Sequence, residues 1–423
     1  MDNKKVKIYT LGCKVNQYDS SFLLSKLELL NFKKVKQNAD LAIINSCAVT
    51  HTAIRKNRQM ISKARKENPR AKIVLMGCWV EAYGDEIKKD KIDLIWGVGK
   101  IEKLVKEIQK QFYADESADI KELPFKNIVS TDKTRYFLKI QDGCEQFCSY
   151  CIIPFTRGKL KSRNEKEIIK EASNAIQKGF KEIILNGIHI GLYGREKNSN
   201  AQKNLNELIT EILKIKDLKR LRLSSIEITE VSDELAFLIK NNKNFCPHLH
   251  ISLQSGSDKI LKLMNRPYDS QYFFQRIKKI RKIIPDIAIS TDIIVGFPGE
   301  NEKDFQDTLN FVEKIKFSKI HVFPYSPHEK TKAFNFPGHL SREEILNRSR
   351  VLRKIALEQE NDFKKQFLNQ EIEVLVEKSN PNGKIMGRSE YYFEVLFSKK
   401  DILDKNCNVD KISNKMLKIK YRS

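Results

Sequence analysis

The stretch Gln141-Asp142-Gly143-Cys144-Glu145-Gln146-Phe147-Cys148-Ser149-Tyr150-Cys151 brings three cysteines together within eight residues. It follows an apolar run that ends at Ile140 and is typical of a β-strand, and Gly143 and Pro154 bracket it as a loop. Three soft thiolates on one loop suit an iron–sulfur cluster, because such clusters are held by cysteine sulfur. A cubane cluster has four irons, so three ligands leave one iron open to a small molecule, as is typical of catalytic metal sites.

A second interpretation treats the same cysteines as packing residues. Positions i, i+4 and i+7 lie on one face of a helix, and that face could carry core thiols. The bracketing glycine and proline favour the loop.

The C-x3-C-x2-C spacing after a first strand resembles that of the radical S-adenosylmethionine (SAM) enzymes. The wording Asp142-Gly143-Cys144, and that from Cys151-Ile152-Ile153-Pro154 to Phe155-Thr156-Arg157-Gly158, is similar to their methylthiotransferase branch. The resemblance implies that Cys144, Cys148 and Cys151 hold a catalytic 4Fe-4S cluster. It also implies that the amino and carboxylate groups of SAM chelate the free iron. The residues by themselves indicate a three-thiolate site.

Length and composition limit the class of protein. At 423 residues the chain exceeds one hydrophobic core, so we expect two or three domains. The absence of a signal-peptide core and of a membrane-length apolar span predicts a soluble, cytoplasmic protein with no membrane partner. In that reducing compartment, eight cysteines favour metal binding or catalysis over disulfides. The net charge of +24 favours a polyanionic partner such as RNA, although a genome bias toward Lys, Ile and Asn would also produce it.

Residues 1–120 alternate strand-like and helix-like segments, which predicts an α/β domain with a parallel sheet. Three strand-like runs end at Cys13, Cys47 and Cys78, at intervals of 34 and 31 residues that match one βαβ repeat. Because the carboxyl ends of parallel strands share one edge of the sheet, we expect the three thiols to converge there. Gly12 would let the backbone approach a bulky group. Core thiols at buried strand ends are the alternative.

The wording around Cys13 (Thr10-Leu11-Gly12-Cys13-Lys14-Val15-Asn16-Gln17) and Cys47 resembles the amino-terminal domain of methylthiotransferases. The resemblance implies a second 4Fe-4S cluster on Cys13, Cys47 and Cys78 that carries or donates sulfur. A basic stretch, residues 55–72, begins beside this edge; it could meet a phosphate backbone or form a solvated helix face.

Residues 114–133 lose periodicity and predict a linker. From 134 to 364, strands and helices alternate six times, which predicts an open, partial (β/α)6 barrel. The strand candidates are 135–141, 180–186, 219–225, 248–254, 286–294 and 318–325. In barrels the chemistry lies at the carboxyl ends of strands, and the cysteine loop follows the first strand as that rule requires.

The fourth strand candidate alternates in polarity. His248, His250, Ser252 and Gln254 share one face, and leucine and isoleucine occupy the other. A polar face inside a barrel suggests a lining for a ligand cavity. His248 and His250 could instead bind a metal together with Cys246, but a role as polar residues that line the barrel is favoured.

The resemblance also implies positions for SAM. Asn186, Gly187 and His189 match the segment whose backbone contacts the amino group, and Ser225 and Glu227 match the segment that holds the ribose or carboxylate. Val295 and Gly296 match the fifth-strand motif that lies against adenine, while Gln254 and Arg266 fall in family-typical wording. Arg266 could contact the bound carboxylate or form a structural salt bridge.

Residues 342–366 predict a helix rich in Arg and Glu. Residues 367–423 then predict a small β-barrel with a turn at Pro381-Asn382-Gly383, which resembles the OB-like TRAM modules of RNA-modifying enzymes. Its 11 basic and 8 acidic residues leave a net charge of +3, mild for an RNA-binding domain. Cys246 and Cys407 lack partners at ligand spacing and are expected to be packed thiols.

Within the methylthiotransferases, the chain looks most like the type that acts on N6-threonylcarbamoyladenosine at position 37 of tRNA. The resemblance implies replacement of the adenine C2 hydrogen by a methylthio group, with two SAM per turnover. The expected partners are the tRNA anticodon stem-loop and an electron donor such as flavodoxin or ferredoxin; we expect a monomer, and the sulfur source stays open. The alternatives are isopentenyladenosine in tRNA, a ribosomal-protein side chain, or a non-enzymatic iron–sulfur RNA-binding protein.

Overall fold

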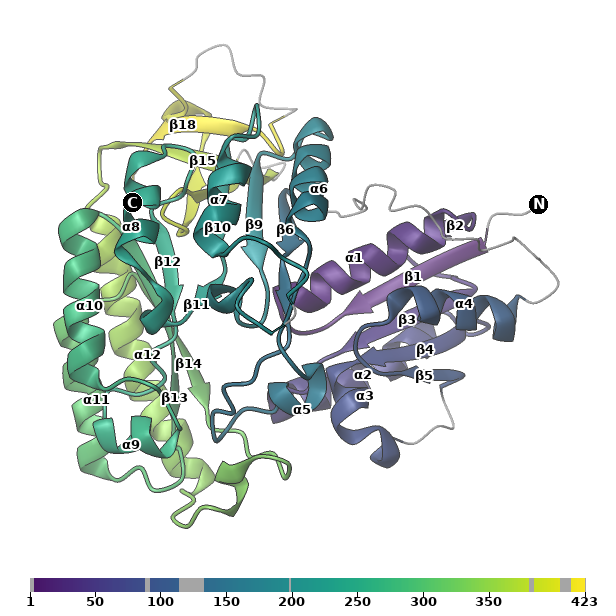
Figure 1. Ribbon diagram of the computed structural model, residues 1–423, viewed down its shortest axis with the longest axis horizontal. Helices are drawn as coiled ribbons and strands as arrows, with labels where there is room; N and C mark the ends of the chain where they lie inside the picture. Colours follow the sequence, from purple (N-terminus) through teal and green to yellow (C-terminus); the bar gives the residue numbers. More distant parts are fainter. Residues whose placement is uncertain are drawn as a thin grey trace.

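The computed structural model describes residues 4–87, 92–113, 133–197, 199–379, 384–403 and 412–422. In chain order these form an amino-terminal unit with a parallel sheet, an open barrel, and an antiparallel carboxyl-terminal sheet (Figure 1). The predicted α/β class and its three parts are therefore confirmed. The predicted linker lies almost entirely outside the described residues. None of the described helices has both the length and the apolar character needed to cross a bilayer.

The amino-terminal unit is built on five parallel strands in the order β2-β1-β3-β4-β5. The strands are β1 (Lys4–Thr10), β2 (Phe32–Lys34), β3 (Leu41–Ser46), β4 (Lys72–Gly77) and β5 (Leu94–Trp96). Helices α1 (Lys14–Glu28) and α4 (Ile101–Phe112) cover one face, and α2 (His51–Glu67) and α3 (Cys78–Tyr83) cover the other. β3 lies at the centre and is buried at every position. The edge strands β2 and β5 were not predicted, because three residues are too few for a periodic pattern.

The barrel contains the six predicted parallel strands in chain order. They are β6 (Arg135–Lys139), β9 (Glu182–Asn186), β10 (Arg220–Leu223), β12 (His248–Ile251), β13 (Ala288–Val295) and β14 (Lys319–Pro324). The two halves of the sheet meet through the bridge from Leu221 to Phe245 and through the pairing of β12 with β11 (Ser225–Ile226), which directly follows β10. Among the described strands β6 and β14 are the two edges, so the barrel is open as expected.

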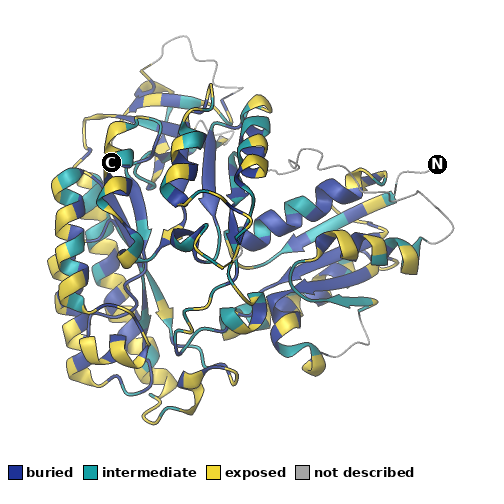
Figure 2. Cartoon of the chain, viewed as in Figure 1, coloured by how far each residue is buried: buried dark blue, intermediate teal, exposed yellow. Residues whose placement is uncertain are grey.

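Helices cover the outside of the barrel, with exposed outer faces and buried inner ones (Figure 2). They are α6 (Glu165–Gln177), α7 (Leu205–Leu213), α8 (Asp233–Asn241), α10 (Ser270–Ile283), α11 (Glu302–Ile315) and α12 (Arg342–Lys365). The shorter elements are β7 (Gln141–Asp142), α5 (Ile153–Arg157), β8 (Lys161–Ser162), β11 (Ser225–Ile226) and α9 (Asp258–Leu263). α12 matches the helix predicted over 342–366.

The carboxyl-terminal sheet lies across one end of the barrel (yellow, top of Figure 1). Its antiparallel strands, in the order β17-β16-β15-β18, are β15 (Glu371–Ser379), β16 (Ile385–Ser389), β17 (Glu394–Phe397) and β18 (Met416–Lys420). The predicted turn at 381–383 and Cys407 lie outside the described residues.

Two buried arginines fasten this sheet to the barrel. Arg220 Nη2 donates to the carbonyl of Glu373 at 2.6 Å, and Arg222 Nη1 donates to the carbonyl of Glu390 at 2.9 Å. Arg222 Nε also lies 2.9 Å from Glu182 Oε1. Burial raises the pKa of Glu182, but the two guanidinium groups outweigh it and bring the pKa to about 2. Buried ion pairs and hydrogen bonds therefore hold the carboxyl-terminal sheet against the base of the barrel.

The amino-terminal unit bridges the two open edges of the barrel. At the β6 edge, Arg163 Nη1 donates to the Tyr18 hydroxyl of α1 at 2.9 Å. At the β14 edge, the backbone N–H of His51 donates to Ser326 Oγ at 2.8 Å, and His328 Nε2 lies 3.1 Å from the Val49 carbonyl. The amino-terminal unit therefore closes the open side of the barrel, and the interior that the two enclose is called the chamber below.

Candidate active site

The first cysteine set lies on the loop between β7 and α5. Residues 143–150 are not helical, so the helix-face interpretation is wrong and the predicted loop is present. Gly143 has φ +73°, and a Cβ there would lie 1.9 Å from the carbonyl oxygen of Lys159. The backbone N–H of Cys144 donates to the carbonyl of Gly158 at 3.0 Å. The loop is thus folded tightly on the segment that follows it.

The three thiols of this loop suit a cluster more than a single ion. Burial raises the pKa of Cys151 to about 12, and burial also raises that of Cys148 although Arg266 opposes it. The negative charge of each thiolate also disfavours ionisation of the neighbouring thiols, so all three can be ionised together only beside a cation. Among the described residues, neither cysteine set brings its ligand atoms within 4.8 Å of one another, as a single metal ion would need. A cubane takes each cysteine on a different iron and fits the wider spacing.

The loop after β9 is pinned to the cysteine loop. The side-chain oxygen of Gln141 accepts from the backbone N–H groups of Ile188 (3.0 Å) and His189 (2.8 Å). A Cβ at Gly187 would lie 2.8 Å from the Gln141 carbonyl, so only glycine fits this approach. Both polar side-chain atoms of the fully buried Asn186 lack a hydrogen-bond partner among the described residues. Such orphaned groups at a strand end are what a polar ligand would satisfy.

His189 contacts the cysteine loop directly. Its Nδ1 lies 3.4 Å from Cys144 Sγ, and its Nε2 lies 2.5 Å from Glu230 Oε1. Burial lowers the pKa of His189, but hydrogen bonds to Cys144 and Glu230 outweigh it and raise the pKa to about 10. The side chain is therefore a cation beside the thiol. Glu230 was missed in the sequence because it carries no motif.

Arg266 forms the salt bridge that the sequence left open as an alternative. Its guanidinium pairs with Glu227, and Nη1 donates to Cys148 Sγ at 3.2 Å. Burial raises the pKa of Glu227 although Arg266 opposes the change. Ser225 is exposed and pairs with His250 in the short β11–β12 ladder. These residues lie at the carboxyl ends of the strands, where the barrel rule places chemistry.

A pocket of about 170 Å³ lies beside the first cysteine set, between the barrel and the amino-terminal unit. It is lined by Val49, Thr50, Tyr150, Cys151, Ile152, Ile153, Gln254, Asp292, Ile294, Phe323, Pro324, Tyr325 and Ser326. Gln254 was a predicted site residue; Val295 and Gly296 do not line this pocket, and their neighbour Ile294 does. The backbone N–H of Gly296 instead donates to Glu300 Oε1 at 2.9 Å.

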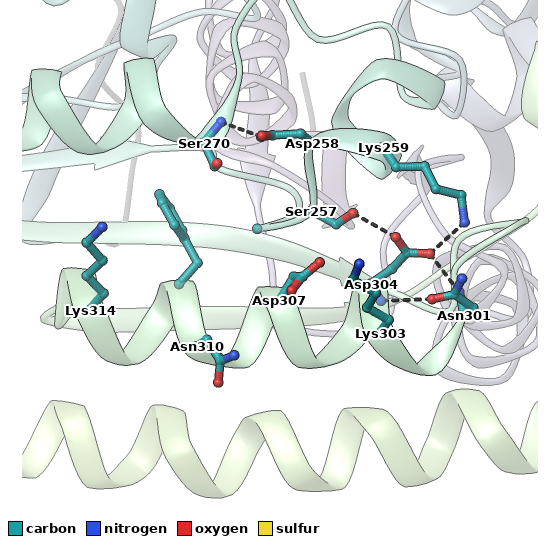
Figure 3. Close-up of a pocket in the computed structure, with 12 residues that line it drawn as sticks. Ser257, Asp258, Lys259, Ser270, Asn301, Lys303, Asp304, Asp307, Asn310 and Lys314 are labelled. Atoms are coloured by element: carbon teal, nitrogen blue, oxygen red, sulfur yellow. Dashed lines mark hydrogen bonds and ion pairs between the residues drawn. The ribbon is translucent and has the colours of Figure 1, made fainter.

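A larger pocket of about 590 Å³ lies outside the barrel, between α9 and α11 (Figure 3). Its central carboxylate, Asp304, accepts from Lys259 Nζ at 2.7 Å and from Ser257 Oγ at 2.9 Å. Asp304 also caps α11 through the N–H of Asn301. Ser257, Lys259 and Asn301 thus pair with Asp304 at the ends of these helices, and no described cysteine lines the pocket, so it is no candidate for the chemistry.

The second cysteine set comes from three neighbouring strand ends. Cys13 follows β1, Cys47 follows β3, and Cys78 follows β4. A Cβ on Gly12, at φ +92°, would lie 2.9 Å from Cys47 Sγ. Burial, together with the neighbouring thiols of Cys78 and Cys13, raises the pKa of Cys47 to about 12. The structure thus brings together the thiols that the sequence predicted to converge.

One buried guanidinium lies between the two sets. Arg157 donates to Asp142 Oδ1 at 2.9 Å and to Asn16 Oδ1 at 2.5 Å, and lies 3.2 Å from Asp19 Oδ2. It also hydrogen-bonds Cys78. Asp142 adjoins the first cysteine loop, whereas the other partners belong to the amino-terminal unit. Sequence reasoning did not single out Arg157, although it stands in the quoted wording after the first cysteine set.

The alternative metal site on the fourth strand is not formed as proposed. Cys246 is buried beside Arg222, and His248 Nε2 lies 3.0 Å from Ser290 Oγ. Within the described part of the chain, the group with metal-ligand spacing is His250, Asp292 and His321. Cys246 is a packed thiol, as expected.

Comparison with known proteins gives two family matches within the chain. The profile described as "Radical SAM superfamily" matches residues 138–312, and "Uncharacterized protein family UPF0004" matches residues 5–97.

Curated relatives are similar over nearly the whole length. The chain is 38% identical to the threonylcarbamoyladenosine tRNA methylthiotransferase MtaB of Thermotoga maritima, over 92% of this chain and 90% of the relative. It is 36% identical to the protein of that name from Bacillus subtilis, over 93% and 90%. It is also 35% identical to a tRNA-2-methylthio-N(6)-dimethylallyladenosine synthase from Thermodesulfovibrio yellowstonii, over 92% and 91%.

Solved structures share the fold at low identity. The radical SAM methyltransferase TsrM from Kitasatospora setae, with cobalamin and a [4Fe-4S] cluster bound, superposes with a TM-score of 0.56 at 12% identity. The superposition covers 79% of this chain and 77% of that chain.

Proposed function

Because the chain belongs to the radical SAM tRNA methylthiotransferases, we propose that it adds a methylthio group to C2 of N6-threonylcarbamoyladenosine at position 37 of tRNA. The observation that carries this proposal is the placement of two three-thiolate sets on either side of one buried arginine, with a pocket beside the first set. A reaction that both removes hydrogen and delivers sulfur needs two such sets within one chamber.

The residues present fit the two 4Fe-4S clusters and the SAM used by this family. We propose that Cys144, Cys148 and Cys151 hold one cluster and that Cys13, Cys47 and Cys78 hold the other. When bound, the first cluster and SAM supply radical chemistry, which an unactivated C2–H bond requires because no protein base could remove its proton.

The protein side chains then have positioning roles. Asn186 offers unpaired donors and acceptors to a polar ligand, and Gly187 keeps the backbone close to the cysteine loop. Glu227 and Arg266 hold one another beside Cys148, and Gln254 lines the pocket. The protonated His189 lies against Cys144 and places a positive charge beside the first cysteine set. Together they exclude water and hold the reacting groups in one geometry.

RNA binding is assigned to two surfaces. Arg55 and Lys56, in the first turns of α2, are exposed near the second cysteine set, and Lys66 and Arg70 extend the basic surface at the other end of the helix. The carboxyl-terminal sheet, within the segment 367–423, provides a second contact. We assign the second cluster to residues 1–120 and the radical reaction to 134–364. We further propose a cytoplasmic monomer that is reduced by a flavodoxin or ferredoxin.

The test is anaerobic incubation of the reconstituted full-length protein with SAM, reductant and tRNA anticodon stem-loops. The stem-loops carry threonylcarbamoyladenosine, isopentenyladenosine or adenosine at position 37, and the products are measured by mass spectrometry. We expect the methylthio product on the threonylcarbamoyl substrate. Product only on the isopentenyl substrate, the substrate class of the dimethylallyladenosine relatives, would overturn the assignment.

A further inference from the structure

The interior of the barrel holds a polar group that neither cysteine set uses. His250 on β12, Asp292 on β13 and His321 on β14 offer atoms that all lie within 4.8 Å of one another. Strand register pairs Asp292 with His321. Leu249 and Ile251 belong to the core beneath the outer helices, so His250, which alternates with them, faces the interior.

This group is accessible from the pocket beside the first cysteine set. The side chains of His250 and Asp292 keep 14% and 25% of their surface exposed, which leaves room for a ligand. His250 Nε2 lies 3.0 Å from Asp292 Oδ2, and its Nδ1 lies 2.9 Å from Ser290 Oγ. Asp292 itself lines the pocket that contains Cys151. A group bound here would therefore adjoin the radical site.

Lys14 adds a cation that has no counterion. It directly follows Cys13, and within the described residues it forms no ion pair. Its Nζ lies 5.9 Å from the ring centroid of Tyr392. Burial lowers the pKa of His321 although Asp292 opposes the change, and the nearby charges of His250, Lys319 and Lys14 add to the lowering. A half-buried, uncompensated ammonium beside the chamber favours an anionic ligand.

The surroundings of Tyr392 give independent evidence of positive potential. Burial raises the pKa of this tyrosine, but Lys14, Arg135 and Arg222 outweigh it and bring the pKa to about 8. The guanidinium groups of Arg222 and Arg388 lie 4.8 and 5.1 Å from its ring centroid. The base of the chamber therefore attracts negative charge.

We propose that Lys14, His250, Asp292 and His321 form the subsite for the substituent on N6 of the target adenine, and that this subsite selects a carboxylate-bearing substituent. This proposal rests on the function proposed above. The ammonium pairs with the carboxylate, the imidazoles donate hydrogen bonds, and Asp292 accepts from a ureido N–H or a hydroxyl.

An apolar substituent fits this subsite poorly. A prenyl group offers neither a charge to the ammonium of Lys14 nor a hydrogen-bond partner to His321. Sites built for such interactions strongly reject analogues that lack them. A metal ion is disfavoured at the same point because Lys14 would add a like charge beside it.

The experiment measures binding of labelled anticodon stem-loops to the reconstituted full-length protein by fluorescence anisotropy. Four stem-loops differ only at position 37, which carries adenosine, isopentenyladenosine, threonylcarbamoyladenosine, or the methyl ester of the last. We expect the wild type to prefer the free acid over the ester by about tenfold or more, since a hydrogen bond to a charged group is lost in the ester.

Lys14→Gln should lower the affinity for the stem-loop with the free acid, leave the affinity for the ester unchanged, and so remove the preference. His321→Leu should weaken both threonylcarbamoyl forms relative to the isopentenyl one, and His321→Gln, which keeps hydrogen-bonding atoms, should restore part of that difference. Lys278→Gln, on the exposed face of α10, removes one charge elsewhere and should change nothing.

Uniform weakening of all four stem-loops by Lys14→Gln, or an unchanged preference, would overturn the subsite. A bound metal other than iron that His321→Leu loses would also overturn it. A wild type that methylthiolates only isopentenyladenosine would instead defeat the proposed function. The two failures are therefore distinguishable.

Discussion

The two cysteine sets reach similar chemistry by opposite routes. Cys144, Cys148 and Cys151 lie on one loop, so their spacing is written in consecutive residues. The other set is drawn from three strand ends separated by 34 and 31 residues, and it exists only once the parallel sheet has formed. The first site depends on the geometry of one loop, and the second depends on the folding of a whole unit.

Serine in place of a single cysteine should give the largest effect and separate the two sets. Cys148→Ser should reduce both SAM cleavage and methylthio product to background, because the radical site loses a ligand. Cys47→Ser should abolish the methylthio product but leave SAM cleavage. Each variant should bind about four irons per chain instead of about eight. Iron analysis and mass spectrometry of deoxyadenosine and of the nucleoside measure the outcome. If Cys47→Ser stopped SAM cleavage as fully as Cys148→Ser, the division of roles would be wrong.

Alanine at the two close-approach glycines should sharpen the comparison. Gly143→Ala forces a methyl group against a backbone carbonyl at 1.9 Å, and both glycines have positive φ. We expect a loss of about 3 kcal/mol or more in unfolding free energy, from backbone strain and overpacking together, and loss of the first cluster. Gly12→Ala meets the Cys47 side chain instead and should selectively lower iron binding at the second set.

Gly158→Ala is the matched control for the first set. Gly158 has φ +70° in the same region of the chain, but no atom lies within 4 Å of its added Cβ. Gly158→Ala should lower the unfolding free energy by about 1–3 kcal/mol, which is the cost of backbone strain without a steric clash. Equal damage from Gly158→Ala and Gly143→Ala would mean that close approach is not what the loop requires.

Arg157→Gln should lower iron binding at both cysteine sets, because this arginine contacts residues beside each of them. The change leaves the buried carboxylate of Asp19 and the half-buried carboxylate of Asp142 without one of their cations and should cost about 3–5 kcal/mol in unfolding free energy. Denaturant unfolding and iron content measure it. Arg195→Gln, at an exposed position, is the control. Loss of iron from only one set would show that Arg157 supports that set alone.

Glu182→Gln should have the smallest effect on either site, since Glu182 lies at the opposite end of the barrel. Its pKa is lowered to about 2 in the folded protein, so its ionic stabilisation is present above pH 4.5 and is lost as the pH falls toward 2. We expect the variant to be about 3 kcal/mol less stable at pH 7, with the gap narrowing below pH 4.5. Acid unfolding of both proteins measures the gap. A gap that stayed constant with pH would assign the loss to packing.

Much of this fold could be predicted from the sequence. The six barrel strands recur along the chain as apolar or alternating runs, and the structure confirms each of them near its predicted position. The short edge strands β2 and β5 could not be predicted, because pairing with a neighbour, rather than their own pattern, makes them strands. The cysteine sets were evident because thiols are rare and their spacing is regular.

The polar residues around the sites were harder to foresee. Arg157, Glu230 and Lys14 act through partners far away in the chain, and although Arg157 and Lys14 stand within the quoted motifs, the sequence does not show what they contact. Arg266 illustrates the limit of motif reasoning. Its motif suggested a contact with a bound carboxylate, but the partner in the structure is the carboxylate of Glu227.

The contacts of residues 49–51 with the segment 326–328 have a consequence for the safety of the reaction. On the proposed function, a chain whose first hundred residues failed to fold would lack the cluster that we assign to sulfur delivery and would also leave the radical open to bulk water and oxygen. Under that function, one folding event thus secures both the sulfur supply and the shielding of the radical, so a half-assembled enzyme would be unprotected as well as inactive.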